Sequence, residues 1–227
     1  MSDLLKLFDK HNTDKGSRKH FYEEVYEPHF EEIRYDNINI LEVGIWKGES
    51  TAALHEYFPN ATIYGIDIFV RTNPEDHLIL RQERVKYIKG DSMDPSIREH
   101  IKKEWPRMKF DIIIDDGAHW PEANRLTFKH LMPLLKKEGK YFIEDVWPLT
   151  ASLMTFQDMN HPWLKKKPEL YSTKAYARFL NEIGYGYKSK LYDVRQKRKI
   201  AAGKSGRPEW IPDSAIMMVE HDNTITD

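Results

Sequence analysis

Five short apolar segments alternate with helical segments through the first two thirds of the chain, and this alternation limits the possible folds more than any other feature. Strands are predicted at residues 37–43, 61–67, 85–89, 110–115 and 140–145, and helices at 21–34, 47–58, 95–105 and 121–137. Strands that alternate with helices form a parallel sheet covered on both faces, with right-handed connections. The sequence therefore predicts an α/β, doubly wound fold.

The remainder of the chain has a different pattern. A helix is predicted at 174–183, followed by strands at 185–194 and 214–221 that no helix need separate. These two strands can pair as an antiparallel hairpin at the sheet edge. The prediction is a mostly parallel seven-stranded sheet with a C-terminal antiparallel strand pair. Residues 1–36 are expected to form an N-terminal helical or lid segment, and residues 37–227 the main domain. A basic insertion is expected at about 195–210.

Composition excludes several classes of protein. The 227 residues include 35 Lys and Arg against 36 Asp and Glu, so the net charge of −1 gives no field that attracts nucleic acid or anionic membranes. The absence of cysteine excludes disulfides, thiolate metal sites and a cysteine nucleophile, and it fits a reducing compartment. No apolar run approaches the roughly 20 residues of a membrane helix, and no signal peptide is recognisable. We therefore expect a cytoplasmic protein without nucleic-acid or membrane partners.

Acidic residues stand at or just after the end of every predicted strand: Glu42, Asp67, Asp91, Asp115 with Asp116, and Glu144 with Asp145. The carboxyl ends of parallel strands share one edge of the sheet, where ligands bind in folds of this kind. Carboxylates gathered there repel each other and lose solvation, which folding alone does not favour. Ligand hydroxyls, amines or a cation would relieve that cost.

The turn after the first strand carries Gly44 and Gly48, which would let a ligand approach the backbone closely. The spacing is neither the dinucleotide fingerprint of a dehydrogenase nor a P-loop. Glu42 suits a ligand with an amino group or a sulfonium better than a pyrophosphate. Asp67 is placed to accept from ribose hydroxyls, and Asp91 from an adenine amino group. The alternative is that the glycines only allow tight packing and that the acids cap helices.

The two acidic pairs indicate a metal site. If the fourth and fifth strands are neighbours, Asp115, Asp116, Glu144 and Asp145 reach one edge and form a hard oxygen site of the kind that Mg²⁺ or Mn²⁺ prefers. In the alternative, two of these acids cap helices and two are solvated.

Several of these segments resemble those of a known family. The run 42–48, with Asp67 and Asp91, is similar to class I S-adenosylmethionine-dependent methyltransferases, which have a Rossmann-like fold. The runs 114–119 and 142–145 resemble the metal-dependent sugar O-methyltransferases of the macrocin and mycinamicin type. The segment 12–16 is similar to one that those enzymes carry ahead of the catalytic sheet. The resemblance covers roughly residues 10–150.

The resemblance implies a role for each matching residue. S-adenosylmethionine would be bound by Glu42, Gly44, Gly48, Asp67, Asp91 and Ser92, with Asp115 facing the cofactor or supporting the loop. The segment with Thr13 and Lys15 would fold over the cofactor as a lid, or else form an ordinary turn before the helix at Phe21. Mg²⁺ or Mn²⁺ would be bound by Asp116, Glu144 and Asp145, and His119 would be the general base.

The implied reaction is the methylation of a hydroxyl group. A divalent cation orients the acceptor hydroxyl, the imidazole of His119 takes its proton, and the oxygen attacks the methyl group on the cationic sulfur. The acceptor is expected to be a sugar or a glycosylated or phosphorylated metabolite. Alternatives are a catechol-like acceptor, a methyltransferase without metal, or a nucleic-acid-binding protein that uses the basic segment.

Two further regions are candidates for acceptor binding. The segment 147–167 contains tryptophans and three consecutive lysines, and residues 195–207 contain six cations that are either a solvated loop or a site for an anionic acceptor. His11, His20 and His29 share no metal-binding spacing and are expected at the surface. Assembly into a homo-oligomer is left open.

Overall fold

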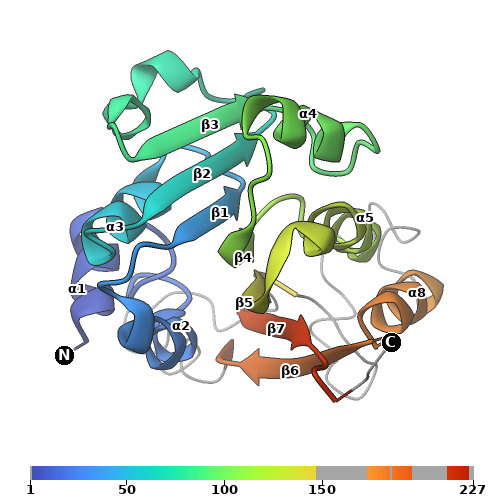
Figure 1. Ribbon diagram of the computed structural model, residues 1–227. Coiled ribbons are helices and arrows are strands. Elements are labelled where there is room, and N and C mark those ends of the chain that lie inside the picture. The colour runs from blue at the N-terminus through green and yellow to red at the C-terminus, as the bar shows by residue number, and fades with distance from the viewer. Residues whose placement is uncertain (1, 147–172, 185, 196–213, 225–227) are drawn as a thin grey trace.

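The computed structural model describes residues 2–146, 173–184, 186–195 and 214–224. Its centre is a seven-stranded sheet in the order β3-β2-β1-β4-β5-β7-β6 (Figure 1). The pairs from β3 to β5 are all parallel, and β7 is antiparallel to both β5 and β6. The predicted fold class, with its C-terminal antiparallel pair, is confirmed.

The elements follow the predicted alternation. The strands are β1 Asn39–Val43, β2 Thr62–Asp67, β3 Val85–Lys89, β4 Phe110–Asp115, β5 Leu135–Ile143, β6 Tyr187–Asp193 and β7 Ala215–His221. The helices are α1 Asp3–Lys10, α2 Glu23–Phe30, α3 Glu49–Tyr57, α4 Ile97–Glu104, α5 Pro121–Leu131 and α8 Thr173–Gly184. None of the helices in these described parts of the chain is long and apolar enough to cross a membrane.

The strand order reverses at β1, which pairs with β2 on one side and β4 on the other. Val43 stands opposite Ile66 of β2 and Asp115 of β4, so the three strands end at the same level. Asp115 in turn stands opposite Ile143, the last residue of β5. The residues that follow β1, β4 and β5 therefore meet at one edge, at the point where such sheets bind ligands.

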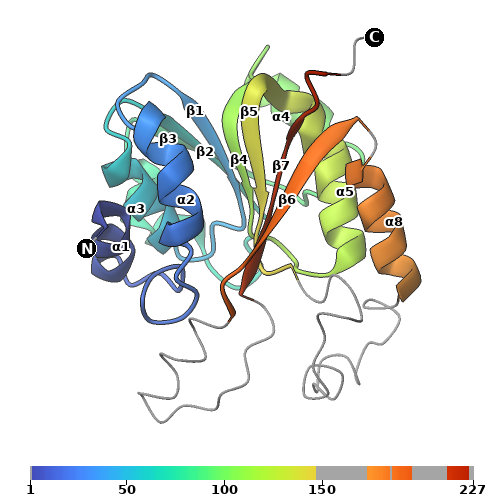
Figure 2. The ribbon, with the colours of Figure 1, turned by 90° about the horizontal axis from the view of Figure 1, so that it is seen from below.

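Each face of the sheet is covered by helices (Figure 2). Ile112 and Ile114 belong to the core on the side of α1, α2 and α3, whereas Ile113 belongs to the core on the side of α4, α5 and α8. This alternation explains why the strands are almost continuously apolar, as is usual for a parallel sheet buried on both sides.

One predicted boundary was wrong. The helix predicted at 121–137 ends at Leu131, and after a 3₁₀ turn at Met132–Leu134 the chain is already in β5. Proline lacks the backbone N–H that an α-helix needs in its interior, which accounts for the stop near Pro133. Gly139 does not close the helix. It lies within β5, where an added Cβ would come within 2.9 Å of the carbonyl oxygen of Asp111.

The predicted N-terminal helical segment begins with α1, for which the sequence analysis gave no bounds of its own. Ser2 caps this helix by accepting a hydrogen bond from the Leu5 amide at 3.1 Å. Leu4 and Phe8 on its inner side are fully buried in the same core as β1 and β4. The N-terminal segment is therefore packed against the sheet, and this packing fixes where the residues between α1 and α2 lie.

Candidate functional site

Unusual backbone conformations cluster at the edge where the strands end. Trp46, His119 and Asp145 follow β1, β4 and β5, and all three have positive φ angles, of 52°, 60° and 51°. A residue other than glycine in this region costs about 1–3 kcal/mol, which folded proteins tolerate mainly at functional sites. The strain therefore marks the same edge that the acidic residues indicate.

Gly44 brings the loops after β1 and β4 into contact. Its φ is +86°, and an added Cβ would lie 2.1 Å from the carbonyl oxygen of Asp116. The Asp116 amide also donates to the carbonyl of Val43 at 3.0 Å. Gly44 thus sets the position of Asp116. The sequence analysis had given Gly44 only a role in binding the cofactor. Gly48 has a φ of +78° and is the N-cap of α3.

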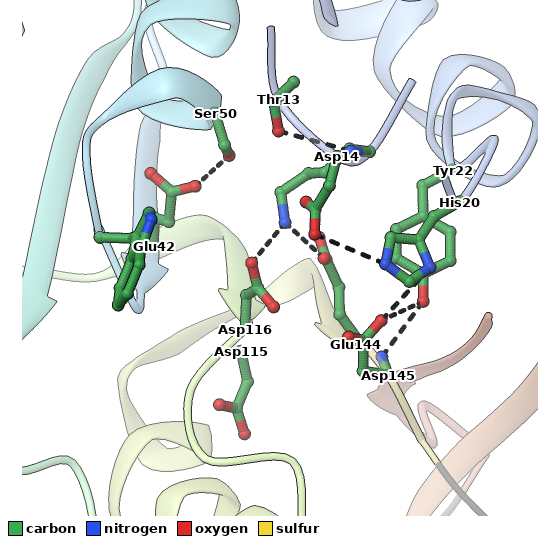
Figure 3. A network of polar contacts seen from close by, with 12 residues as sticks. Thr13, Asp14, His20, Tyr22, Glu42, Ser50, Asp115, Asp116, Glu144 and Asp145 are labelled. Carbon is green, nitrogen blue, oxygen red and sulfur yellow. Dashed lines mark hydrogen bonds and ion pairs between the residues drawn. The ribbon is translucent and has the colours of Figure 1, made fainter. Parts of the chain in front are cut away.

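Glu42 is buried at the end of β1, with 1% of its surface exposed. Its carboxylate accepts a hydrogen bond from the hydroxyl of Ser50 on α3 (Figure 3). The hydroxyl of Thr51, also on α3, donates to the second carboxylate oxygen at 2.5 Å. Burial raises the pKa of Glu42, and the nearby Lys15 ammonium and the two hydroxyls oppose that rise. Glu42 therefore connects the strand end with the first turn of α3.

Asp67 and Asp91 lie at the ends of the neighbouring strands and organise their own loops. Asp67 accepts from the amides of Trp46 at 2.9 Å and Phe69 at 2.6 Å, which joins the loops after β1 and β2. The exposed Asp91 accepts from the amide of Met93 at 2.9 Å. A carboxylate has about four acceptor positions, so both residues keep capacity for ligand hydroxyl or amino groups.

Ser92, next to Asp91, forms a hydrogen bond of 2.8 Å with the hydroxyl of Thr127 on α5. Its carbonyl oxygen is 3.1 Å from Nδ1 of His130 on the same helix. The loop after β3 is therefore attached to α5, and Ser92 is engaged by protein groups as well as being close to the acidic edge.

A group of possible metal ligands lies after β4 and β5. Asp116, His119 and Asp145 each offer one ligand atom, and these three atoms lie within 4.8 Å of one another. Nε2 of His119 is 3.7 Å from Oδ1 of Asp116. Mg²⁺ bonds of about 2.1 Å allow opposite donors to stand about 4.2 Å apart, and the longer Ca²⁺ bonds allow about 5 Å. Two carboxylates and an imidazole with these separations fit a divalent cation.

Glu144 lies beside this group but has other partners. Its Oε2 accepts from the ammonium of Lys15 at 2.5 Å, and its Oε1 accepts from the hydroxyl of Tyr26 on α2. The same ammonium donates to Oδ2 of Asp116 at 2.5 Å. Burial alone would lower the pKa of Lys15, but the surrounding carboxylates, Asp116 and Glu144 first, raise it well above its usual value. Lys15 is therefore a buried cation among the predicted metal ligands.

Asp145 is held by residues from the segment around α2. The hydroxyl of Tyr22 donates to its Oδ1 at 2.5 Å, and Nδ1 of His20 is 3.7 Å from the same oxygen (Figure 3). Burial alone would raise the pKa of Asp145, but His20 and His119 lower it. The Asp145 carboxylate is therefore kept in its charged form, which a metal ligand requires.

The expectation that His20 lies at the surface was wrong. Only 1% of it is exposed, its ring stacks on Tyr22 at 4.7 Å, and its Nδ1 lies 2.8 Å from the hydroxyl of Ser214. Ser214 is 194 residues away in the chain, so local spacing gave no signal of this contact. His11 and His29 are half-buried.

Asp115 points away from the other acids (Figure 3). It is 1% exposed, and burial raises its pKa to about 7. Its Oδ1 accepts from the amide of Gly117 at 3.3 Å, whereas its Oδ2 has no partner among the residues that the structure describes. Thr13 is also buried, and its hydroxyl accepts from the Lys15 amide at 3.4 Å.

The structure thus gathers Lys15, Glu42, Asp116, His119, Glu144 and Asp145 at one edge, with Asp67, Asp91 and Ser92 along the adjoining loops. Sequence reasoning missed Tyr22, the N-cap of α2, and Tyr26 on that helix, which both reach the acids. The acceptor candidates at 147–167, and the basic insertion beyond Arg195, lie outside the described residues.

Comparisons with known proteins agree with this geometry. Residues 41–146 match a family model described as a methyltransferase domain. Demethylmacrocin O-methyltransferase of Streptomyces fradiae is 33% identical over 152 residues, which cover 64% of this chain and 36% of that protein. Mycinamicin VI 2''-O-methyltransferase of Micromonospora griseorubida is 31% identical, with 64% and 36% covered. The chain thus spans little more than a third of the length of these curated relatives.

Solved structures share the fold. The MycE methyltransferase from the mycinamycin biosynthetic pathway, determined in complex with Mg and SAH, has a TM-score of 0.67 and 23% identity, and the match covers 100% of this chain and 57% of that one. Another structure of the same enzyme also contains mycinamycin VI. The resemblance to class I methyltransferases and to the macrocin and mycinamicin type is confirmed by these matches.

Proposed function

We propose that this chain, in which residues 41–146 match a methyltransferase domain, transfers a methyl group from S-adenosylmethionine to a hydroxyl of a sugar-containing acceptor with the help of a divalent cation. The observation that carries the proposal is the convergence of ligand atoms from Asp116, His119 and Asp145, of which Asp145 is buried. This group stands beside the loops after β1, β2 and β3, which carry Gly44, Gly48, Asp67 and Asp91. A cation site next to a cofactor edge is the arrangement that a metal-dependent methyl transfer requires.

The cofactor would lie along the loops after β1, β2 and β3. In this proposal Gly44 and Gly48 admit the methionine part, Asp67 accepts from the ribose hydroxyls, and Asp91 with Ser92 lies by the adenine. Glu42, Asp115, Thr13 and Lys15 would line or support that site. Asp67 already joins two of these loops through the Trp46 and Phe69 amides, so the ribose would bind to a preformed turn.

The cation would be held by Asp116, Glu144 and Asp145. Carboxylate oxygens suit Mg²⁺ or Mn²⁺, and the cation would supply Lewis acidity toward the acceptor hydroxyl. Tyr22 fixes the Asp145 carboxylate through its hydroxyl at 2.5 Å. Gly44 fixes the loop that carries Asp116.

His119 would take the proton of the acceptor hydroxyl. Its Nε2 is 3.7 Å from Asp116, its side chain is 38% exposed, and its Nδ1 has no partner within the described ranges. Imidazole is the side chain that most often acts as a general base in enzymes, and this one is open to an acceptor on its exposed side. The oxygen would then attack the methyl group, which leaves the sulfur as a neutral thioether.

Sugar acceptors are supported by the names of the relatives. They include enzymes that act on demethylmacrocin, on mycinamicin VI and on a rhamnosyl tetracenomycin, the last from Streptomyces olivaceus. We further propose that the protein acts on small molecules in the cytoplasm and not on nucleic acid.

The test is a methyl-transfer assay with radiolabelled S-adenosylmethionine, Mg²⁺ and a panel of glycosylated and catechol acceptors. We expect transfer to sugar hydroxyls that stops when EDTA removes the metal. His119→Ala should lower turnover at least about 100-fold, the lower end of what a general base contributes, while His100→Ala on α4 serves as the control. Activity that survives EDTA, or unchanged turnover in His119→Ala, would contradict the proposal.

A further inference from the structure

Lys15 was expected beside the cofactor, but the structure pairs it with two of the predicted metal ligands. Its side chain is 2% exposed, although it comes from the loop between α1 and α2, and its ammonium lies 2.5 Å from both Asp116 and Glu144. Burying an ammonium is costly unless it is paired. The same is true of the two carboxylates, so each of the three groups needs the others when no metal is bound.

The position of Lys15 is built into the fold. The Tyr22 amide donates to its carbonyl at 2.8 Å. The next residue, Gly16, is so close to α1 that an added Cβ would lie 2.4 Å from Oδ1 of Asp9 and 3.0 Å from Cβ of Phe8. The backbone on both sides of Lys15 is thus attached to α1 and α2, and its side chain is aimed at the ends of β4 and β5.

The Lys15 ammonium contacts only some of the possible metal ligands. Glu144 is occupied by Lys15 and Tyr26, whereas Asp116, His119 and Asp145 have ligand atoms close enough to share a cation. Asp116 takes part in both groups of contacts, because its Oδ2 accepts from Lys15 while its Oδ1 faces His119. A divalent cation held by Asp116 and Glu144 would have to share both carboxylates with a positive charge.

We propose that Lys15 is an internal counter-ion that competes with the divalent cation for Asp116 and Glu144. It stabilises the acidic group when metal is absent, and it lowers the metal affinity of the site. This inference rests on the proposed function, because it assumes that the same acids bind the catalytic metal. Lys15 is accordingly a positioning residue rather than one that touches the reacting atoms.

The experiment compares Mn²⁺ binding by calorimetry in the full-length chain and its variants, all first stripped with EDTA. Lys15→Met removes the charge and keeps the length of the side chain, and Lys15→Arg keeps the charge. Lys10→Met is the matched control, because Lys10 also pairs with a carboxylate, Glu56, at 2.6 Å but is 59% exposed. Lys15→Gln, which keeps an N–H donor, replaces Lys15→Met where the latter does not fold.

We expect Lys15→Met to bind Mn²⁺ at least about tenfold more tightly than wild type, within the usual range of coupling between two sites. Its melting temperature without metal should fall, and Mn²⁺ should raise it more than in wild type. Lys10→Met and Lys15→Arg should bind Mn²⁺ like wild type. Equal or weaker Mn²⁺ binding by Lys15→Met would overturn the competition while leaving the metal site intact. No Mn²⁺ binding by any form would overturn both proposals.

A measurement on the wild-type protein gives an independent readout. A buried, paired ammonium exchanges its protons slowly, so Lys15 should give a side-chain ¹⁵N resonance in the metal-free protein that is missing in Lys15→Arg. Saturation with Mg²⁺ should shift or remove this resonance. A resonance unchanged at saturating Mg²⁺ would refute the competition between Lys15 and the cation.

Discussion

The contact between the loops after β1 and β4 predicts a large effect for Gly44→Ala. Two costs add at this position. A side chain at a φ of +86° costs about 1–2 kcal/mol. The added Cβ would lie 2.1 Å from the Asp116 carbonyl oxygen, and such contacts are essentially never shorter than 3.0 Å, so the loops must separate by nearly an ångström. Overpacking of this kind typically costs a further 1–3 kcal/mol or so.

Gly186→Ala is the matched control for Gly44→Ala. Gly186 has almost the same φ, +82°, but an added Cβ there meets no atom of the described residues within 4 Å. It should therefore lose only the conformational cost of about 1–2 kcal/mol, whereas Gly44→Ala should lose about 2–5 kcal/mol in total. In a chain of this size each kcal/mol lowers the melting temperature by about 2–4 °C. Urea unfolding and thermal melting of both variants measure the difference.

The same displacement should reach the metal site. Because the clash moves Asp116 itself, Gly44→Ala should weaken Mn²⁺ binding at least about tenfold and lower turnover about 100-fold, the usual effect of a 1 Å misplacement. Gly186→Ala should retain both properties. If the two variants lose the same stability and bind Mn²⁺ equally well, the close approach of the two loops does not control the site, and the reasoning is refuted.

Three further outcomes follow from the buried groups. The raised pKa of Asp115, about 7 against an ordinary 3.8, means that the folded protein keeps a proton that the unfolded chain releases. Stability of the metal-free protein should therefore fall as pH rises from about 4 to about 7 and level off above that, and Asp115→Asn should flatten this slope in urea titrations across that range. Tyr26→Phe removes the donor to Glu144 and should cost about 1–3 kcal/mol of unfolding free energy, whereas Tyr35→Phe at an exposed position should cost nothing measurable. Removing bound metal with EDTA should lower the melting temperature, and adding Mn²⁺ should restore it, whereas a melting temperature insensitive to both would contradict a metal site in the native protein.

The sheet could be predicted from sequence because its signals are local. Each strand is a short apolar run, and the acid that ends it is adjacent in the chain, so the edge with Asp67, Asp116 and Glu144 followed from topology alone. The limit of α5 was missed because apolar residues continue through Met132 into β5, and the 3₁₀ turn between them has no distinct periodicity.

The partners of the acids could not be predicted because they come from distant parts of the chain. Lys15 is 129 residues from Glu144, and Tyr22 is 123 residues from Asp145. The resemblance of segment 12–16 placed Lys15 in a lid over the cofactor, but only the packing of α1 and α2 against the sheet directs its ammonium to Asp116. Similarly, His20 gave no sign of burial, because the contact with Ser214 forms only when β7 joins the sheet.

The central claim is that the ends of β4 and β5 form a divalent-cation site beside the cofactor edge. Its most direct test is a crystal structure of the protein with Mn²⁺ and S-adenosylhomocysteine, with the anomalous signal of manganese recorded. The account predicts a single strong peak within about 2.0–2.6 Å of carboxylate oxygens of Asp116 and Asp145, close to the sulfur of the ligand. A manganese peak at another place in the protein, or S-adenosylhomocysteine bound with no manganese at these two residues, would contradict it.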